Sequence, residues 1–283
     1  MIKTVKELKK VLDFAWALSQ DELYASYHRL KTKEKVKDYI ERAILSDSDR
    51  IIACYDQEIL SGVSIYFGKP DENYAQTTMF LIKGDYDKIA DEMIGHMAKE
   101  FPSCDLLIGF PFSNKMAETY FTKRNYPCVD ALLDCRINHL QAHDNPKSDV
   151  LEEITKENFK DYVDFHDRFA LPLQMYYNSH KLEKDLKRFR IFVFKDHGQI
   201  QASIFYVKGN ISEIYGLFID EAYKHKGIES ILIDEVLMQL YKECGCVENL
   251  AYFIEEDSTV ELDAALAVGF NIVDTYRCYK CKL

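Results

Sequence analysis

The chain has 283 residues, 47% of them hydrophobic and 29% charged, with only 11 glycines and 6 prolines. This composition excludes disordered, collagen-like and low-complexity proteins, and the length allows two domains with separate cores. The net charge of −11 argues against nucleic-acid binding and against binding to anionic membranes, because both need a concentrated positive field. We therefore expect neither a nucleic-acid partner nor a membrane partner.

The start of the chain intersperses lysines among apolar residues at helical spacing and lacks the continuous apolar core of a signal peptide. No stretch approaches the length needed to span a bilayer. The eight cysteines are scattered through apolar runs, so we expect reduced core residues and a cytoplasmic protein. Cys278 and Cys281 have CxxC spacing, but no second pair lies at metal-site spacing, so we expect no metal.

The first half of the chain predicts the element order ααβββαβαβ. Thr4 and Glu7 match a capping box before a first helix, and a second helical pattern follows. The expected elements after the first helix are a helix over 33–45, strands over 51–55, 59–67 and 74–83, a helix over 86–101, a strand over 105–110, a helix from 114 and a strand over 129–137.

Residues 141–149 are polar, contain Pro146 and lack periodicity, so they are the expected linker. The same order of elements then restarts. It comprises helices over 156–169 and 180–187, strands over 191–194, 199–207 and 212–219, a helix over 227–244, a strand over 249–254, a helix over 258–268 and a strand over 271–281.

Local echoes support a duplication. The turn at 55–59 corresponds to the turn at 195–199, and the helix from 114 corresponds to the helix from 258 at a similar offset. The sequence therefore predicts an α/β (α+β) protein with two tandem domains, residues 1–140 and 150–283.

A basic segment between a strand and a helix is the most informative motif. The apolar strand ends at Ile219, and Lys224, His225 and Lys226 then lead through Gly227 into an amphipathic helix. Backbone N–H groups and the dipole at a helix N-terminus favour an anion, and a glycine lets the backbone approach it closely. This arrangement is typical of a phosphate-binding loop, although the same residues also suit an ordinary turn and a solvated helix start.

This motif resembles that of the GNAT superfamily of N-acetyltransferases, Arg/Gln-x-x-Gly-x-Gly/Ala after the fourth strand. Lys224 stands at the Arg/Gln position, Gly227 at the first Gly and Glu229, a departure, at the second. The resemblance implies, in each copy, a central mixed, mostly antiparallel sheet flanked by helices. It also implies acetyl-CoA as co-substrate, held by Lys224, His225, Lys226, Gly227, Ile228, Glu229 and Ser230.

A second family pattern, Val-x-x-x-Asn-x-x-Ala-x-x-Leu-Tyr-x-x-x-Gly-Phe, follows the fifth strand. Its Gly-Phe is present as Gly269 and Phe270, and Ser258 at the Asn position is both a candidate cofactor contact and the start of a capping box. Glu261 stands at the Ala position. Ala265 replaces the tyrosine that often protonates the departing thiolate, so that proton would come from Tyr252, Tyr276 or water.

The resemblance also implies roles on the fourth strand. Glu213 stands where one branch of the family carries its glutamate base, and its alternative is a strand-surface glutamate paired with a lysine. Pantetheine would pair with the exposed edge at Leu217, Phe218 and Ile219, where a backbone N–H would polarise the thioester. The loop 172–180 would line the acceptor site.

The first copy has two aspartates, Asp85 and Asp87, where the second has its basic loop, so we expect it to lack the cofactor. The predicted function is transfer of an acetyl group from acetyl-CoA to a primary amine on a small molecule or a protein. The alternative is a non-catalytic GNAT-like module for CoA binding or recognition, which Glu229 and Ala265 favour.

Overall fold

The computed structural model describes residues 1–27, 29–141, 149–171, 175–207 and 212–283. The chain forms two compact units: unit 1 comprises residues 1–131 and 275–283, and unit 2 comprises residues 132–274. Most of the expected linker, residues 142–148, lies outside the described residues. Within the described part of the chain, no helix is long and apolar enough to cross a membrane.

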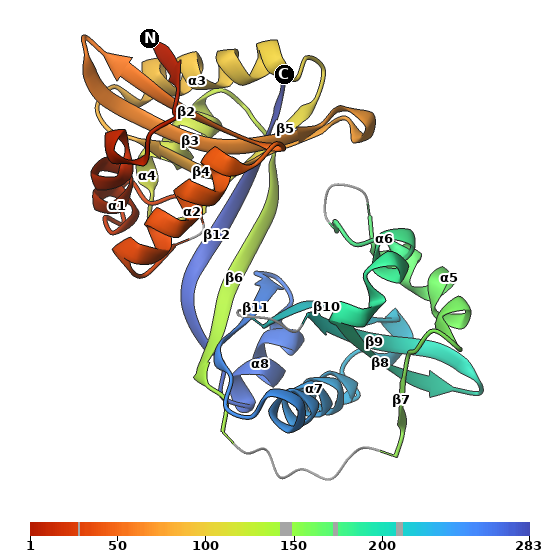
Figure 1. Cartoon of the computed structure of the whole chain (residues 1–283). Helices are drawn as coiled ribbons and strands as arrows, with labels where there is room; N and C mark the ends of the chain where they lie inside the picture. The colour runs from red at the N-terminus through yellow and green to blue at the C-terminus, as the bar shows by residue number, and fades with distance from the viewer. Residues whose placement is uncertain (28, 142–148, 172–174, 208–211) are drawn as a thin grey trace. The chain divides into compact units, whose positions relative to one another are not determined.

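Unit 1 is a sheet with helices on both faces (Figure 1). Its strand order is β1-β2-β3-β4-β5-β12, in which β4 and β5 are parallel and the other neighbours antiparallel. Its elements are β1 (Ile2–Thr4), α1 (Leu12–Ser19), α2 (Lys33–Leu45), β2 (Asp49–Asp56), β3 (Ile59–Lys69), β4 (Tyr74–Ile82), α3 (Tyr86–Glu100), β5 (Asp105–Pro111), α4 (Lys115–Lys123) and, near the end of the chain, β12 (Asn271–Lys282), with short 3₁₀ turns at Leu8–Lys10 and Pro70–Glu72.

Unit 2 repeats this plan with the strand order β6-β11-β10-β9-β8-β7, in which β10 and β11 are parallel. Its elements are β6 (Cys128–His139), β7 (Leu151–Glu153), α5 (Phe159–Phe169), α6 (Ser179–Lys184), β8 (Phe189–Asp196), β9 (Gln199–Val207), β10 (Glu213–Ile219), α7 (Ile228–Cys244), β11 (Glu248–Glu255) and α8 (Thr259–Ala267). The expected α/β class with mixed, mostly antiparallel sheets flanked by helices is confirmed.

Side-chain alternation along the strands builds two cores in unit 2. Ile191 and Phe205 pack with α5 and α6, whereas Phe192 and Ile204 pack with α7 and α8. Successive residues of a strand point to opposite faces, so both faces need apolar residues. This explains why these strands are nearly continuous apolar runs.

The last strand of each expected copy lies in the other unit. Residues 132–139 of β6 pair with β11, and Cys135 and Ile137 belong to the core of unit 2. Residues 276–282 of β12 pair with β5, and Tyr279 and Cys281 belong to the core of unit 1. The two units thus exchange their final strands.

The hairpin turns preserve the duplication at residue level. Gln57 and Glu58 both have positive φ, as do His197 and Gly198 at the corresponding turn. Two successive positive φ values are typical of the tight turn that matches the twist of antiparallel strands. The offset is 140 residues for both positions (197 − 57 and 198 − 58), as expected from the sequence.

The expected capping box at Thr4 is wrong. Ile2–Thr4 is a strand that pairs with Ile52–Cys54, and the first α-helix begins only at Leu12. A matching short strand, Leu151–Glu153, pairs with β8 in unit 2. Neither strand is expected from the sequence, because a three-residue edge strand is too short to show an alternating pattern.

Candidate active site

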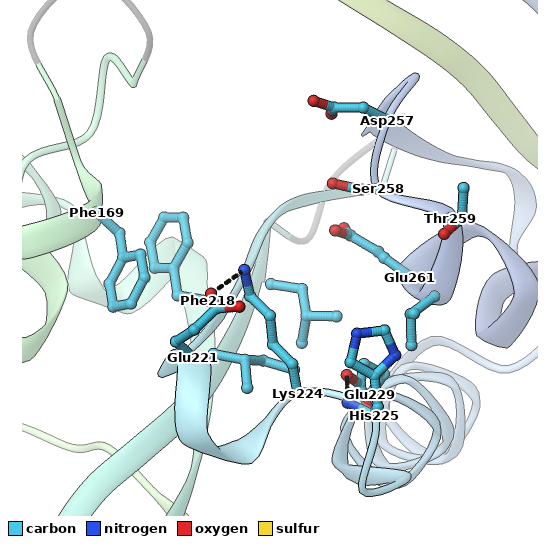
Figure 2. Close-up of a pocket in the computed structure, with 13 residues that line it drawn as sticks. Phe169, Phe218, Glu221, Lys224, His225, Glu229, Asp257, Ser258, Thr259 and Glu261 are labelled. Atoms are coloured by element: carbon cyan, nitrogen blue, oxygen red, sulfur yellow. Dashed lines mark hydrogen bonds and ion pairs between the residues drawn. The ribbon is translucent and has the colours of Figure 1, made fainter.

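A cavity of about 470 Å³ opens in unit 2 between the end of β10 and the N-terminal ends of α7 and α8 (Figure 2). Seven of the expected site residues line it: Leu217, Phe218, Ile219, Lys224, His225, Glu229 and Ser258. Six further residues complete the wall: Phe169, Glu221, Asp257, Thr259, Val260 and Glu261. The volume lies within the range of small-molecule sites.

The cavity lies where two parallel strands separate. β10 and β11 pair only at Glu213 with Ala251 and at Ile214 with Tyr252 among the described residues. A bulge between Ile214 and Gly216 shifts the register of β10 against β9 immediately beyond this point. Leu217 to Ile219 therefore present a strand edge to the cavity, and such an edge can hydrogen-bond to an extended ligand.

The loop before α7 has the backbone of an anion cradle. His225 and Gly227 have φ values of 62° and 79°, which turn the chain sharply just before the helix. A Cβ built on Gly227 would meet nothing within 4 Å, so the space beside it is open. Four of the expected cofactor residues do not line the cavity: Lys226, Gly227, Ile228 and Ser230. Lys226 lies over the ring of Tyr223, and Ile228 is part of the core.

The charges on the wall are predominantly acidic. Lys224 Nζ forms an ion pair with Glu221 Oε2 at 2.7 Å. Glu229 turns inward, is 3% exposed, and its Oε1 accepts a hydrogen bond of 3.2 Å from the backbone N–H of His225. A carboxylate of the helix itself thus lies at the helix N-terminus, where an anionic ligand would otherwise be favoured.

Glu213 lies at the start of β10, beside the point of strand separation, and does not line the cavity. Burial raises the pKa of its carboxyl to about 7; Arg136 lowers this pKa and Asp134 raises it. Arg136 and Asp134 form an ion pair on β6, two strands away. A carboxyl group with a pKa near 7 is suited to accept a proton at neutral pH.

Tyr252 is fully buried, and its hydroxyl donates a hydrogen bond to Glu261 Oε1. Burial raises the pKa of Tyr252 well above its ordinary value, and Glu261 contributes to this rise. Burial likewise raises the pKa of Glu261 to about 7. Glu261 points into the cavity from α8 (Figure 2). Tyr252 does not line the cavity itself and is linked to it through this carboxyl group.

The expected capping box at Ser258 is also wrong. Ser258 occupies the N-cap position of α8, but its side chain makes no capping hydrogen bond, and Glu261 binds Tyr252 instead. The Ser258 side chain lies on the cavity wall. Ala265, at the family's tyrosine position, is fully buried and carries no hydroxyl.

An aromatic wall closes the cavity opposite α8 (Figure 2), and half of it is not among the residues expected from the sequence. The rings of Phe169 and Phe218 stack with centroids 5.1 Å apart and planes 7° apart. Nothing in the sequence marks Phe169, which ends α5 far from the motif. Glu261 stands at the Ala position of the family pattern, so a carboxylate in place of a small residue is the sequence signal that marks it.

His166, on α5, is fully buried. Its Nδ1 lies 2.9 Å from the Tyr162 hydroxyl and its Nε2 lies 2.7 Å from the Tyr177 carbonyl oxygen. Burial lowers the pKa of His166, which favours the neutral ring. Tyr177 belongs to the expected acceptor loop, of which residues 172–174 lie outside the described residues.

In unit 1 the equivalent strand edge is occupied by the chain itself. The backbone N–H of Phe80 on β4 donates to Ser26 Oγ at 2.8 Å, and Asn114 donates to the Ala25 carbonyl at 3.0 Å. The helix that follows β4 is capped by Asp85, whose side chain accepts from the Lys88 N–H. These contacts favour the prediction that the first copy lacks the cofactor.

Unit 2 has a mixed sheet whose parallel strands separate next to a glycine loop and a helix N-terminus. The resemblance to the GNAT superfamily implies this arrangement. Residues 151–270 match the family model described as the acetyltransferase (GNAT) family. This match supports acyl transfer as the general class of reaction. No curated protein matches the sequence.

Solved structures with the same fold extend over the whole chain. A GCN5-related N-acetyltransferase from Sphaerobacter thermophilus aligns with a TM-score of 0.66 and 11% identity, covering 100% of this chain and 95% of that one. A tandem GNAT protein from the clavulanic acid biosynthesis pathway aligns with a TM-score of 0.57 and 11% identity, covering 100% and 98%.

A third similar structure is the GCN5-related glucosamine N-acetyltransferase region of a fungal multi-domain GH3 β-N-acetylglucosaminidase. Its TM-score is 0.63 at 15% identity, over 99% of this chain and 38% of that one. Identities this low show a common fold and nothing about the acceptor.

Proposed function

We propose that unit 2 transfers an acetyl group from acetyl-CoA to a primary amine. The observation that carries this proposal is the separation of β10 from β11 at Ile214, next to the cavity and to Glu213. Proteins of the GNAT family generally use acetyl-CoA, which would supply an activated acyl group. The edge at Leu217–Ile219 would hold its pantetheine arm.

Glu213 acts as the base. An alkylamine has a pKa of about 10.4 and reaches the protein protonated, so it must lose a proton before it can attack a carbonyl. The Glu213 carboxylate, whose pKa is about 7, accepts that proton directly or through water. The net charge of −11 also favours approach of a cationic acceptor, either a small molecule or a protein.

Tyr252 acts as a positioning residue. Its hydroxyl donates to Glu261, which fixes the carboxyl group that faces the cavity. With Ala265 at the tyrosine position, Glu261 is the group on this part of the wall that can hold a proton near neutral pH. Tyr276, the other tyrosine considered, belongs to unit 1, where it pairs with Pro111.

The cavity fits one part of the cofactor and not another. The strand edge and the loop at Gly227 suit an extended thiol arm and a close backbone contact. The Glu229 carboxylate does not suit a diphosphate, because two anions would share the N-terminus of α7. This mismatch also favours the second candidate function, a non-catalytic recognition module.

The test is release of free thiol from acetyl-CoA in the presence of a panel of alkylamines, polyamines and lysine peptides. Glu213→Gln is compared with Glu248→Gln, a change of an exposed glutamate on the neighbouring strand. The proposal expects acceptor-dependent thiol release that falls in Glu213→Gln and persists in Glu248→Gln. Equal rates in the two variants would remove Glu213 from its role, and no release with any amine would favour the recognition module.

A further inference from the structure

A single row of residues crosses three strands of unit 2 and ends at Glu213. Arg136 on β6 pairs with Ala251 on β11, and Ala251 in turn pairs with Glu213 on β10. Residues paired across a sheet point to the same face. Leu250 and Tyr252, the neighbours of Ala251, belong to the core that includes α7 and α8, so the row lies on the opposite face of the sheet.

Ala251 separates the two charged side chains of this row by a small apolar residue. Adjacent strands lie about 4.8 Å apart, so the Cα atoms of Arg136 and Glu213 are about 10 Å apart. The side chain of Ala251 ends at its Cβ, whereas the arginine side chain is long and can reach across one strand. The row thus lets the positive charge of Arg136 act on the Glu213 carboxyl, whose pKa it lowers.

Asp134 binds the same guanidinium group. It is two positions from Arg136 on β6, so the two side chains share a face. Both carboxylate oxygens accept hydrogen bonds from the guanidinium, with 2.9 Å between Nη2 and Oδ2. The Arg136 and Asp134 side chains are 15% and 7% exposed, so water and salt screen this pair little. Asp134 therefore offsets part of the positive charge and raises the pKa of Glu213.

The other neighbours of Glu213 on the sheet are uncharged. Its partner on β9 is Val207, and its partner on β11 is Ala251. On β10 itself the titratable neighbour is Tyr215, whose pKa is raised mainly by burial and also by the charge of Glu213; Arg188, just before β8, acts on this tyrosine. Within the described part of the chain, the charges that act on the Glu213 carboxyl are those of the ion pair on β6.

We infer that the ion pair of Asp134 and Arg136 acts through Glu213 and keeps this proposed base able to exchange protons near neutral pH. The inference rests on the proposed function. Without Asp134, the guanidinium would hold Glu213 as an anion that takes up protons weakly. Without Arg136, burial would keep the carboxyl protonated. Both are positioning residues, and neither lines the cavity.

The ion pair also gives the first half of the chain a part in the chemistry of the second. β6 is the last strand of the first expected copy, yet its residues 132–139 pair with β11 of unit 2. The second expected copy, residues 150–283, contains Glu213 and neither member of the ion pair. The exchange of strands therefore brings the ion pair of one copy next to the proposed base of the other.

The experiment measures the protonation of Glu213 in the full chain by NMR, with no acyl donor or acceptor present. Glutamate labelled with carbon-13 at the carboxyl carbon is followed between pH 5 and 9, and the signal of Glu213 is the one that Glu213→Gln removes. The titration is repeated in Asp134→Asn and in Arg136→Gln. Arg190→Gln is the matched control, because Arg190 is a partly buried arginine of β8 that forms an ion pair of 2.7 Å with Glu243.

The two variants should move the titration midpoint of Glu213 in opposite directions. In Asp134→Asn it should fall by about one pH unit, because the guanidinium charge is no longer offset. In Arg136→Gln it should rise by about one pH unit, because burial and Asp134 then both favour the neutral acid. Arg190→Gln should keep the wild-type midpoint. The midpoint of the pH–rate profile for thiol release should shift in the same two directions.

Midpoints that stay at the wild-type value, or that move in the same direction in both variants, would overturn the inference. A merely structural ion pair would lower stability in both and leave the titration unchanged. If neither single variant folds, the double variant Asp134→Asn/Arg136→Gln decides: its midpoint should lie above that of the wild type, because Arg136 influences Glu213 more than Asp134 does, and an unchanged midpoint would overturn the inference. Shifted midpoints without thiol release from any amine would overturn the proposed function and leave the control of Glu213 by the ion pair standing.

Discussion

Glu261 provides a test of the site that needs no substrate. Its side chain is half-buried on the cavity wall, and the pKa of its carboxyl group is raised from the ordinary 4.5 to about 7. The folded state thus favours the neutral acid more than the unfolded state does. Stability from this group is fully present below pH 4.5 and is lost as the pH rises through 7.

The size of the effect follows from the two pKa values. A difference of about 2.5 corresponds to about 3 kcal/mol, since one pKa unit equals about 1.4 kcal/mol. Glu261→Gln stays neutral at every pH, and its amide oxygen can still accept the hydrogen bond from Tyr252. The variant should therefore match the wild type near pH 4.5 and exceed its stability by about 3 kcal/mol at pH 9.

The assay is urea unfolding followed by circular dichroism at several pH values between 4.5 and 9. Glu248→Gln, which removes an exposed carboxyl group, is the control and should show no such growing difference. A constant difference between Glu261→Gln and wild type at every pH would refute the reasoning. The reasoning would also be refuted if the wild type became more stable relative to Glu261→Gln as the pH rises.

Three further outcomes are expected. Glu213→Gln should lower turnover at pH 8 by about 100-fold with little change in CoA affinity. Because the base has a pKa of about 7, the wild-type rate should rise about tenfold between pH 6 and 8, and a flat pH–rate profile would contradict this. Ser26→Ala should destabilise unit 1 by about 1–3 kcal/mol in urea, because the buried Phe80 N–H loses its partner; an unchanged midpoint would argue against that contact. Tyr279→Ala should lower the free energy of unfolding by about 3 kcal/mol and make unit 1 sensitive to limited proteolysis, because this ring of β12 packs in the core of unit 1. Proteolysis confined to unit 2 would contradict the strand exchange.

Much of the fold could be predicted from periodicity and turn signals. The long strands and helices lie close to their expected ranges, and the hairpin turns recur at the expected offset of 140 residues. The three-residue strands β1 and β7 were missed because a short edge strand has no readable period. The Thr4 capping pattern was misleading because a pairing partner, Ile52, was available on β2.

The exchange of the final strands could not be predicted from the order of elements. Both β6 and β12 are long strands of similar pattern, and either would complete a sheet next to β5 or β11 by pattern alone. Which sheet each strand joins depends on packing, such as the stacking of Tyr279 on Phe110 and Phe121. Local sequence patterns do not predict such long-range contacts.

The cavity was predicted in part. The family motif located the β10 edge and the loop at Lys224 and His225, because these groups are contiguous in sequence. Phe169 and the hydrogen bond between Tyr252 and Glu261 come from separate elements, so only the fold brings them to the wall. The inward direction of Glu229 was likewise undetermined by sequence, since residues at a helix start can face either way.

The location of the acyl-CoA site in unit 2 is tested most directly by calorimetric titration of acetyl-CoA into Gly227→Trp and Gly198→Trp. Both glycines have positive φ and open space around the missing Cβ, so the two substitutions impose similar backbone strain. Only Gly227 lies at the loop before α7. We predict one acetyl-CoA site in the wild type, retained in Gly198→Trp and lost in Gly227→Trp. Binding that survives in Gly227→Trp, or no binding by the wild type, would contradict the account.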